Sequence, residues 1–123
     1  MAGPSKRTLT AALAVLRQIE ERHADRSRWC QGVYARDAAG QPVSEFGAAI
    51  STCLEGVRLI TAAPENKFVR NTVRQIIEEA SGNLYPGRHP SRINDCLGYE
   101  AVRRVERLAV EMAEAILAER EGK

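Results

Sequence analysis

Aromatic residues are scarce in this sequence: only six of its 123 residues are Phe, Trp or Tyr. A core with few aromatic rings must be built from Ala, Leu, Ile and Val, and these side chains allow helices to pack closely. The length suits one domain, since a chain of this size buries about two-thirds of its unfolded surface in a single core. A second domain is therefore not expected.

The sequence also lacks a large excess of charge of one sign, because its 18 Lys and Arg residues nearly balance its 16 Asp and Glu residues. Proteins that bind along a phosphate backbone carry a marked basic excess, so general nucleic-acid binding is not expected. No apolar run approaches the roughly 20 residues that span a bilayer, and residues 1–6 lack the apolar centre of a signal peptide. These absences predict no membrane association and a cytoplasmic location.

Cysteine occurs at three separated positions, Cys30, Cys53 and Cys96, with no Cys-x-x-Cys pair. An odd set without paired spacing does not form a disulfide framework, so we expect reduced thiols. The same spacing argues against zinc, whose structural sites draw on closely paired ligands. We expect neither a metal nor a cofactor, although the chain holds other residues of metal-binding type: His23, His89 and Asp95.

Apolar residues recur three and four positions apart in four stretches, which is the spacing of one helical face. The predicted helices cover residues 9–23 (capped by Thr8), 45–62 (capped by Ser44), 65–80 (ended by Gly82) and a last stretch that ends near 119. Residues 1–7 are polar and predict a disordered tail, so the folded domain is expected over residues 8–120. Cys53 lies on the apolar face of the second predicted helix, which favours a buried core thiol.

The last predicted helix is the longest and has the clearest apolar stripe: Val102, Val105, Ala109, Met112 and Ile116. Asn94 and Asp95 are good capping residues, and Gly98 can adopt backbone conformations closed to other residues. The helix is therefore expected to start at Asp95 or just after Gly98. Its apolar surface extends to a second side through Ala101, Leu108 and Ala115, so a homodimer formed through this helix is a further expectation.

Between the first two predicted helices, residues 29–36 and 41–43 form two short extended pieces around a Gly-containing turn, which predicts a small β-hairpin. Trp29, the only tryptophan, stands at the junction of helix and loop and is expected to anchor the loop on the core. The predicted fold is all-α or nearly so: a compact four-helix domain with a small β-hairpin after the first helix.

Short motifs occur in a fixed order: Trp29-Cys-Gln-Gly32, Ala35-Arg36-Asp37 with Gly40, Cys53-x-x-Gly56, and Ile93-Asn94-Asp95. This order resembles a family of small bacterial and phage proteins known as domain of unknown function 6197. Its pattern consists of a Trp-x-Gln-Gly element, an Ala-Arg-Asp-x-x-Gly turn, a Cys-x-x-Gly helix and an Asn-Asp turn before the last helix. The resemblance spans residues 9–112 and implies a compact, mostly helical protein. The family has no established activity, so the resemblance implies no catalytic residue.

The loop before the last helix is the candidate site, because basic residues there approach a helix start whose free amides and dipole favour an anion. The predicted ligand-binding residues are Arg88, His89, Arg92, Asn94, Asp95, Arg103 and Arg107. A phosphate or a nucleotide would suit them. An alternative explains the same arginines as a solvated face of ion pairs, since Glu100, Glu106 and Glu111 lie three or four residues from Arg104, Arg103 and Arg107.

A thiol enzyme would need a cysteine, a base and an orienting residue, and the loop holds these types in Cys96, His89, Asn94 and Asp95. Their crowding in one loop argues against catalysis, because such groups usually come from separate elements. A hydrogen-bonded turn, in which Asn94 or Asp95 caps the last helix, is favoured instead. No catalytic residue is predicted.

The expected function is a non-enzymatic binding or interaction protein. It would act as an accessory factor of a phage or mobile element that engages and modulates a host protein, with anti-defence activity as a candidate role. The alternative is a protein that sequesters a small phosphorylated ligand such as a signalling nucleotide. An enzyme ranks third.

Overall fold

The structure is a computed structural model that describes residues 3–43 and 49–122. Its helices are α1 (Lys6–Arg22), α2 (Leu54–Ala62), α3 (Lys67–Leu84), α4 (Pro90–Arg92) and α5 (Tyr99–Glu121), with a 3-10 turn η1 (Arg26–Arg28) and a π-helical turn η3 (Ile93–Leu97). Two short strands, β1 (Ala35–Arg36) and β2 (Ser51–Thr52), pair antiparallel. The mostly helical fold is confirmed. The four predicted helices correspond to α1, α2, α3 and α5, and α4 adds one turn.

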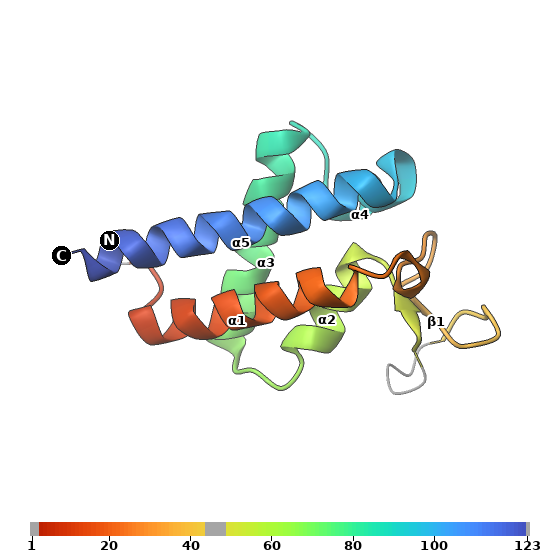
Figure 1. Ribbon diagram of the computed structural model, residues 1–123, viewed down its shortest axis with the longest axis horizontal. Helices are drawn as coiled ribbons and strands as arrows, with labels where there is room; N and C mark the ends of the chain where they lie inside the picture. The colour runs from red at the N-terminus through yellow and green to blue at the C-terminus, as the bar shows by residue number, and fades with distance from the viewer. Residues whose placement is uncertain (1–2, 44–48, 123) are drawn as a thin grey trace.

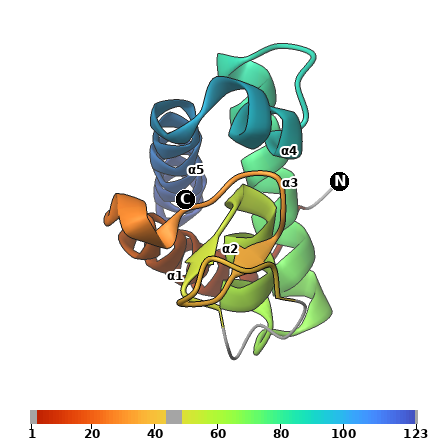
Figure 2. The same ribbon diagram turned by 90° about the vertical axis from the view of Figure 1, so that its right-hand side faces the viewer.

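Helices α1 and α5 lie side by side in opposite directions, and α3 crosses both of them (Figure 1). Ion pairs between α1 and α5 match this antiparallel arrangement, since Arg17 contacts Glu114 at 2.8 Å and Arg107 contacts Glu20 at 3.3 Å. Such exposed pairs contribute little stability. The β strands, the loop before them and η3 gather at one end of the helices (Figure 2).

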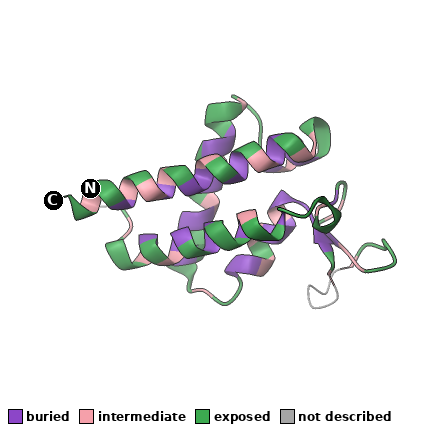
Figure 3. Ribbon diagram, viewed as in Figure 1, coloured by how far each residue is buried: buried purple, intermediate pink, exposed green. Residues whose placement is uncertain are grey.

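The core is built almost entirely from aliphatic side chains where α1, α2, α3 and α5 meet (Figure 3). On α5, Val102, Val105 and Ala109 are buried as predicted, whereas Met112 and Ile116 are only half-buried at the edge of the core. The prediction that Glu106 lies on a solvated face is wrong, because this side chain is completely buried. The buried stripe of α5 therefore contains a carboxyl group.

The second helix is shorter than predicted and begins at Leu54. Residues 49–53 are not helical, because the backbone amides of Ile50 and Cys53 donate hydrogen bonds to Arg36 O at 2.8 Å and Tyr34 O at 3.1 Å. The chain therefore pairs with β1 before it enters α2, and the side chain of Ile50 is exposed. The predicted start of this helix, residues 44–48, lies outside the described residues.

The predicted hairpin is present only in part. Asp37 Oδ1 closes the expected turn by accepting the amides of Ala39 and Gln41 at 2.9 and 3.0 Å. Among the described residues, the two arms are joined at one bridge, between Arg36 and Pro42. The main partner of β1 is β2, which the sequence pattern had placed in a helix.

Helix ends also differ from the pattern. Helix α1 starts at Lys6 because Ser5 Oγ, not Thr8, accepts the amide of the first turn, so the helix includes two residues of the expected tail. Helix α3 continues through Gly82 to Leu84 and ends just before Pro86. In the part of the chain that the structure describes, no helix has both the length and the apolar character to cross a membrane.

Candidate functional site

The turn η3 reverses the chain just before α5 and carries the Asn-Asp pair. Its wide π-type turn is closed by the amide of Gly98, which donates to Ile93 O at 3.2 Å. Gly98 has φ = 88°, a left-handed conformation that favours glycine, and α5 then begins at Tyr99. The second of the two predicted starts for this helix is therefore confirmed.

Asn94 is fully buried and joins three segments that are distant in the sequence. Its Oδ1 accepts the indole N–H of Trp29 at 2.7 Å and the amide of Leu54 at 2.9 Å. Its Nδ2 donates to Cys30 O at 3.0 Å and to Asp95 Oδ1 at 3.2 Å. The prediction that Asn94 or Asp95 caps the last helix is wrong: α5 has no side-chain cap, and Asn94 instead accepts the amide of Leu54, the first residue of α2.

Residues 29–34, between η1 and β1, form a loop that we call the Trp29 loop. Asp95 and Gln31 complete its docking on η3. Asp95 Oδ1 accepts the amide of Gly32 at 3.0 Å, and Gln31 Nε2 donates to Asn94 O at 2.9 Å and Asp95 O at 3.3 Å. The ring of Trp29 also packs on the ring of Tyr99, with centroids 5.5 Å apart. The Trp-x-Gln-Gly and Asn-Asp motifs, about 60 residues apart in the sequence, thus form one hydrogen-bonded unit.

The Cys-x-x-Gly motif starts α2 beneath the same loop. Cys53 Sγ accepts the amide of Gly56 at 3.2 Å and so caps the helix. Gly56 has no room for a side chain, since a Cβ would lie 2.0 Å from Tyr34 O. Burial raises the pKa of the Cys53 thiol, with the amides of Gly56 and Glu55 opposing that rise. Cys53 is therefore a buried thiol, as predicted, but it caps α2 instead of lying within the helix.

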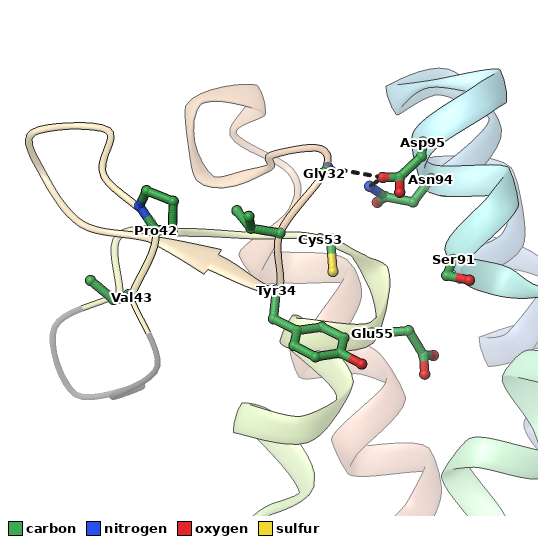
Figure 4. A pocket seen from close by; sticks show the side chains of 10 residues that line it. Gly32, Tyr34, Pro42, Val43, Cys53, Glu55, Ser91, Asn94 and Asp95 are labelled. Atoms are coloured by element: carbon green, nitrogen blue, oxygen red, sulfur yellow. Dashed lines mark hydrogen bonds between the residues drawn. The ribbon is translucent and has the colours of Figure 1, made fainter.

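An open pocket of about 620 Å³ lies where these segments meet (Figure 4). Its apolar wall comes from the loop around β1, and polar groups from α2, α4 and η3 form the rest. The lining residues are Gly32, Val33, Tyr34, Pro42, Val43, Cys53, Glu55, Ser91, Asn94 and Asp95. This volume is within the usual range of ligand pockets, roughly 300 to 1,000 Å³.

The seven residues predicted to bind a ligand do not come together in one site. Asn94 and Asp95 line the pocket, whereas Arg88, His89 and Arg92 are exposed around α4, where His89 Nδ1 accepts the amide of Ser91 at 3.2 Å.

Arg103 and Arg107 lie on α5 in ion pairs with Glu106 (3.1 Å) and Glu111 (3.6 Å), the pairs that the alternative interpretation named. Among the described residues, no Lys, Arg or His lines the pocket.

Sequence reasoning missed a buried polar network beside the pocket. His23 and Glu106 are fully buried, and His23 Nδ1 is hydrogen-bonded to Glu106 Oε2. His23 Nε2 lies 2.9 Å from Thr52 O and 3.1 Å from Thr52 Oγ1, so both ring nitrogens have polar partners. Arg103 contacts the other carboxyl oxygen. The sequence held one sign of this burial: Glu106 lies four residues after Val102 and three before Ala109, so it falls on the same buried face of the helix.

Within residues 3–43 and 49–122, no group of three or more His, Cys, Asp or Glu side chains could hold a metal ion. Cys30 and Cys53 are buried free thiols and Cys96 is an exposed one.

Replacing Asn94 with Ala is expected to lower the free energy of unfolding by about 2 to 3 kcal/mol, because it leaves the amide of Leu54 and the carbonyl of Cys30 without partners. Trp29 loses its indole partner as well, so its fluorescence should shift to longer wavelength. Denaturant unfolding followed by this single tryptophan measures both effects. Asn71→Ala, at an exposed position of α3, is the matched control and should change stability by less than about 0.5 kcal/mol.

Comparison with protein-family models, with curated proteins and with solved structures gave no match to this chain.

Proposed function

We propose that this chain is a non-enzymatic binding protein that holds an apolar group of a partner in the pocket beneath the Trp29 loop. The observation that carries the proposal is the pocket itself: its apolar wall is formed by Val33, Tyr34, Pro42 and Val43, and Tyr34 is 57% exposed. An exposed ring beside a concave apolar surface is typical of a site that a partner covers.

The polar floor of the pocket supports binding more than catalysis. Asn94 already uses its side chain in four hydrogen bonds, and Cys53 Sγ accepts the amide of Gly56. Burial raises the pKa of this thiol, which opposes nucleophilic activation. Both groups are thus engaged in holding the pocket together.

Sequestration of a phosphorylated ligand has weaker support. That hypothesis requires basic groups around the ligand, whereas the ionisable residues of the pocket are acidic ones such as Glu55 and Asp95. Arg103, Arg104 and Arg107 line a separate depression on α5, where Arg103 pairs with Glu106 and Arg107 pairs with Glu20 and Glu111. A phosphate would have to compete with carboxylates at either place.

The biological role that we propose follows from the sequence motifs. The resemblance to the family of small bacterial and phage proteins supports an accessory factor that engages a host protein, with anti-defence activity as the candidate role. Self-association through the outward face of α5, where Ala115 is exposed and Leu108 half-buried, is a separate prediction that light scattering would test.

Selection from a library of random displayed peptides tests the binding function. The wild-type protein should enrich peptides that bind it, and Tyr34→Ala should weaken their binding about tenfold, because the ring forms part of the apolar wall. Phe68→Ala is the matched control, since it removes another exposed ring, on α3, away from this pocket. Equal binding by all three proteins would place the partner elsewhere, and no enrichment would contradict the proposal.

A further inference from the structure

The charge of the pocket identifies the kind of group that it can hold. Glu55 and Asp95 are its two carboxylates. Arg58 pairs with Glu55, at 3.4 Å from Oε1 and 3.1 Å from Oε2, and both side chains are largely buried. Asp95 has no such partner, because no Lys, Arg or His in the described part of the chain forms an ion pair with it. One carboxylate of the lining, Asp95, is therefore without an ion-pair partner among the described residues.

The carboxylate of Asp95 is also held in a fixed orientation. Its Oδ1 accepts two hydrogen bonds, from the amide of Gly32 at 3.0 Å and from Asn94 Nδ2 at 3.2 Å. Its Oδ2 has no donor among the residues that the structure describes. The carboxylate thus offers one oriented acceptor at the edge of the pocket (Figure 4). A positively charged N–H donor would make a charge-assisted hydrogen bond there.

The apolar wall suits the remainder of a basic side chain. Arginine and lysine place an aliphatic stem against apolar surface while their charged end reaches a polar group. Val33 and Val43 can pack on such a stem, and the exposed ring of Tyr34 offers a face for the cation.

The backbone N–H of Val33, the residue before Tyr34, donates to no backbone carbonyl among the described residues. An extended polypeptide could supply this acceptor through a carbonyl and cover Tyr34 with its next residue.

We propose that the occupant of the pocket is an arginine or lysine side chain of an extended, apolar-flanked segment of a partner protein, bound by Asp95 and Tyr34. This inference rests on the proposed function, because it names the group that the binding pocket recognises. Contact with the apolar wall buries surface of the partner. The negative charge of Asp95 favours a basic residue over a neutral or acidic one.

The test uses the peptides selected by the wild-type protein. One of them is also synthesised in a neutral form, with citrulline in place of its arginine or norleucine in place of its lysine. The selected sequences should share a basic residue next to apolar ones. Asp95→Asn keeps the acceptor for the Gly32 amide and removes the charge, so it should weaken binding of the basic peptide about tenfold. The neutral peptide should bind the wild-type protein and Asp95→Asn equally.

Glu100→Gln, which removes an exposed carboxylate on α5, is the matched control and should bind the basic peptide as the wild-type protein does. The selected peptides could instead lack a basic residue, bind Asp95→Asn as well as the wild-type protein, and fail to bind Tyr34→Ala. That result would overturn this inference while still supporting the proposed binding function of the pocket. Peptides whose binding does not depend on Tyr34 would overturn the proposed function as well. Competition by arginine amide at the same concentration as the peptide would show that a small amine, not a polypeptide, is the occupant.

Discussion

Replacement of Gly56 with Ala is expected to lower the free energy of unfolding by about 3 kcal/mol or more. A Cβ at this position would lie 2.0 Å from Tyr34 O and 2.9 Å from Tyr34 C, both backbone atoms. Neither can yield easily, because the amide of Cys53 donates to the same oxygen at 3.1 Å. The clash must therefore move α2 or the β1 loop, and urea unfolding followed by circular dichroism would record the loss.

Gly82→Ala is the control for this change. Gly82 lies inside α3 with nothing within 4 Å of the added Cβ, so alanine should stabilise the protein by about 0.5 to 1 kcal/mol. A Gly56→Ala protein as stable as wild type would show that α2 does not pack under Tyr34, and the wall of the pocket would then be wrongly placed.

Replacement of Glu106 with Leu is expected to cost about 3 to 5 kcal/mol, because it leaves His23 and Arg103 without the carboxyl group that both contact. Glu106→Gln should cost only about 1 kcal/mol, since its amide can donate to His23 Nδ1 while its carbonyl accepts from Arg103. Thermal and denaturant unfolding of the two variants would measure the difference. Equal stability of Glu106→Leu and wild type would contradict the buried network.

The pH dependence of stability should carry the signature of the same carboxyl group. Burial raises the pKa of Glu106 above its ordinary value of 4.5, and His23 and Arg103 oppose the rise without cancelling it. The folded state therefore holds the proton more tightly than the unfolded state. The contribution of Glu106 is complete below about pH 4.5 and falls as the pH rises through the folded pKa. Relative to Glu106→Gln, which cannot ionise, wild type should lose stability from pH 4 towards 7.

Helical periodicity predicted the long helices of this protein because α1, α3 and α5 each bury one face against the others. The pattern failed at residues 49–53, where Ile50 and Cys53 also happen to fit a helical stripe. The amide of Ile50 instead donates to Arg36 O, and the amide of Cys53 donates to Tyr34 O. This strand pairing depends on the position of the loop around β1, which the local sequence does not determine.

The candidate site was predictable only in part. Residues 94 and 95 stood out as polar residues at a turn, and both line the pocket. Their role could not be derived locally, because Asn94 bonds to residues 40 to 65 positions away. The buried Glu106 was misassigned for a related reason: its spacing from Arg103 suits a surface ion pair, and its buried partner His23 lies far away in the sequence, just after the end of α1.

The pocket as the binding site is tested most directly by titrating isotope-labelled protein with a selected peptide and following backbone amide shifts by nuclear magnetic resonance. We expect the largest shifts at Gly32, Val33, Tyr34 and Asp95, and Asp95→Asn should need about ten times more peptide to reach the same shifts. The amides of Arg103 and Arg107, in the separate depression on α5, should change little. Shifts that centre on Arg103 and Arg107 and leave the Gly32 to Tyr34 loop unaffected would contradict the assignment.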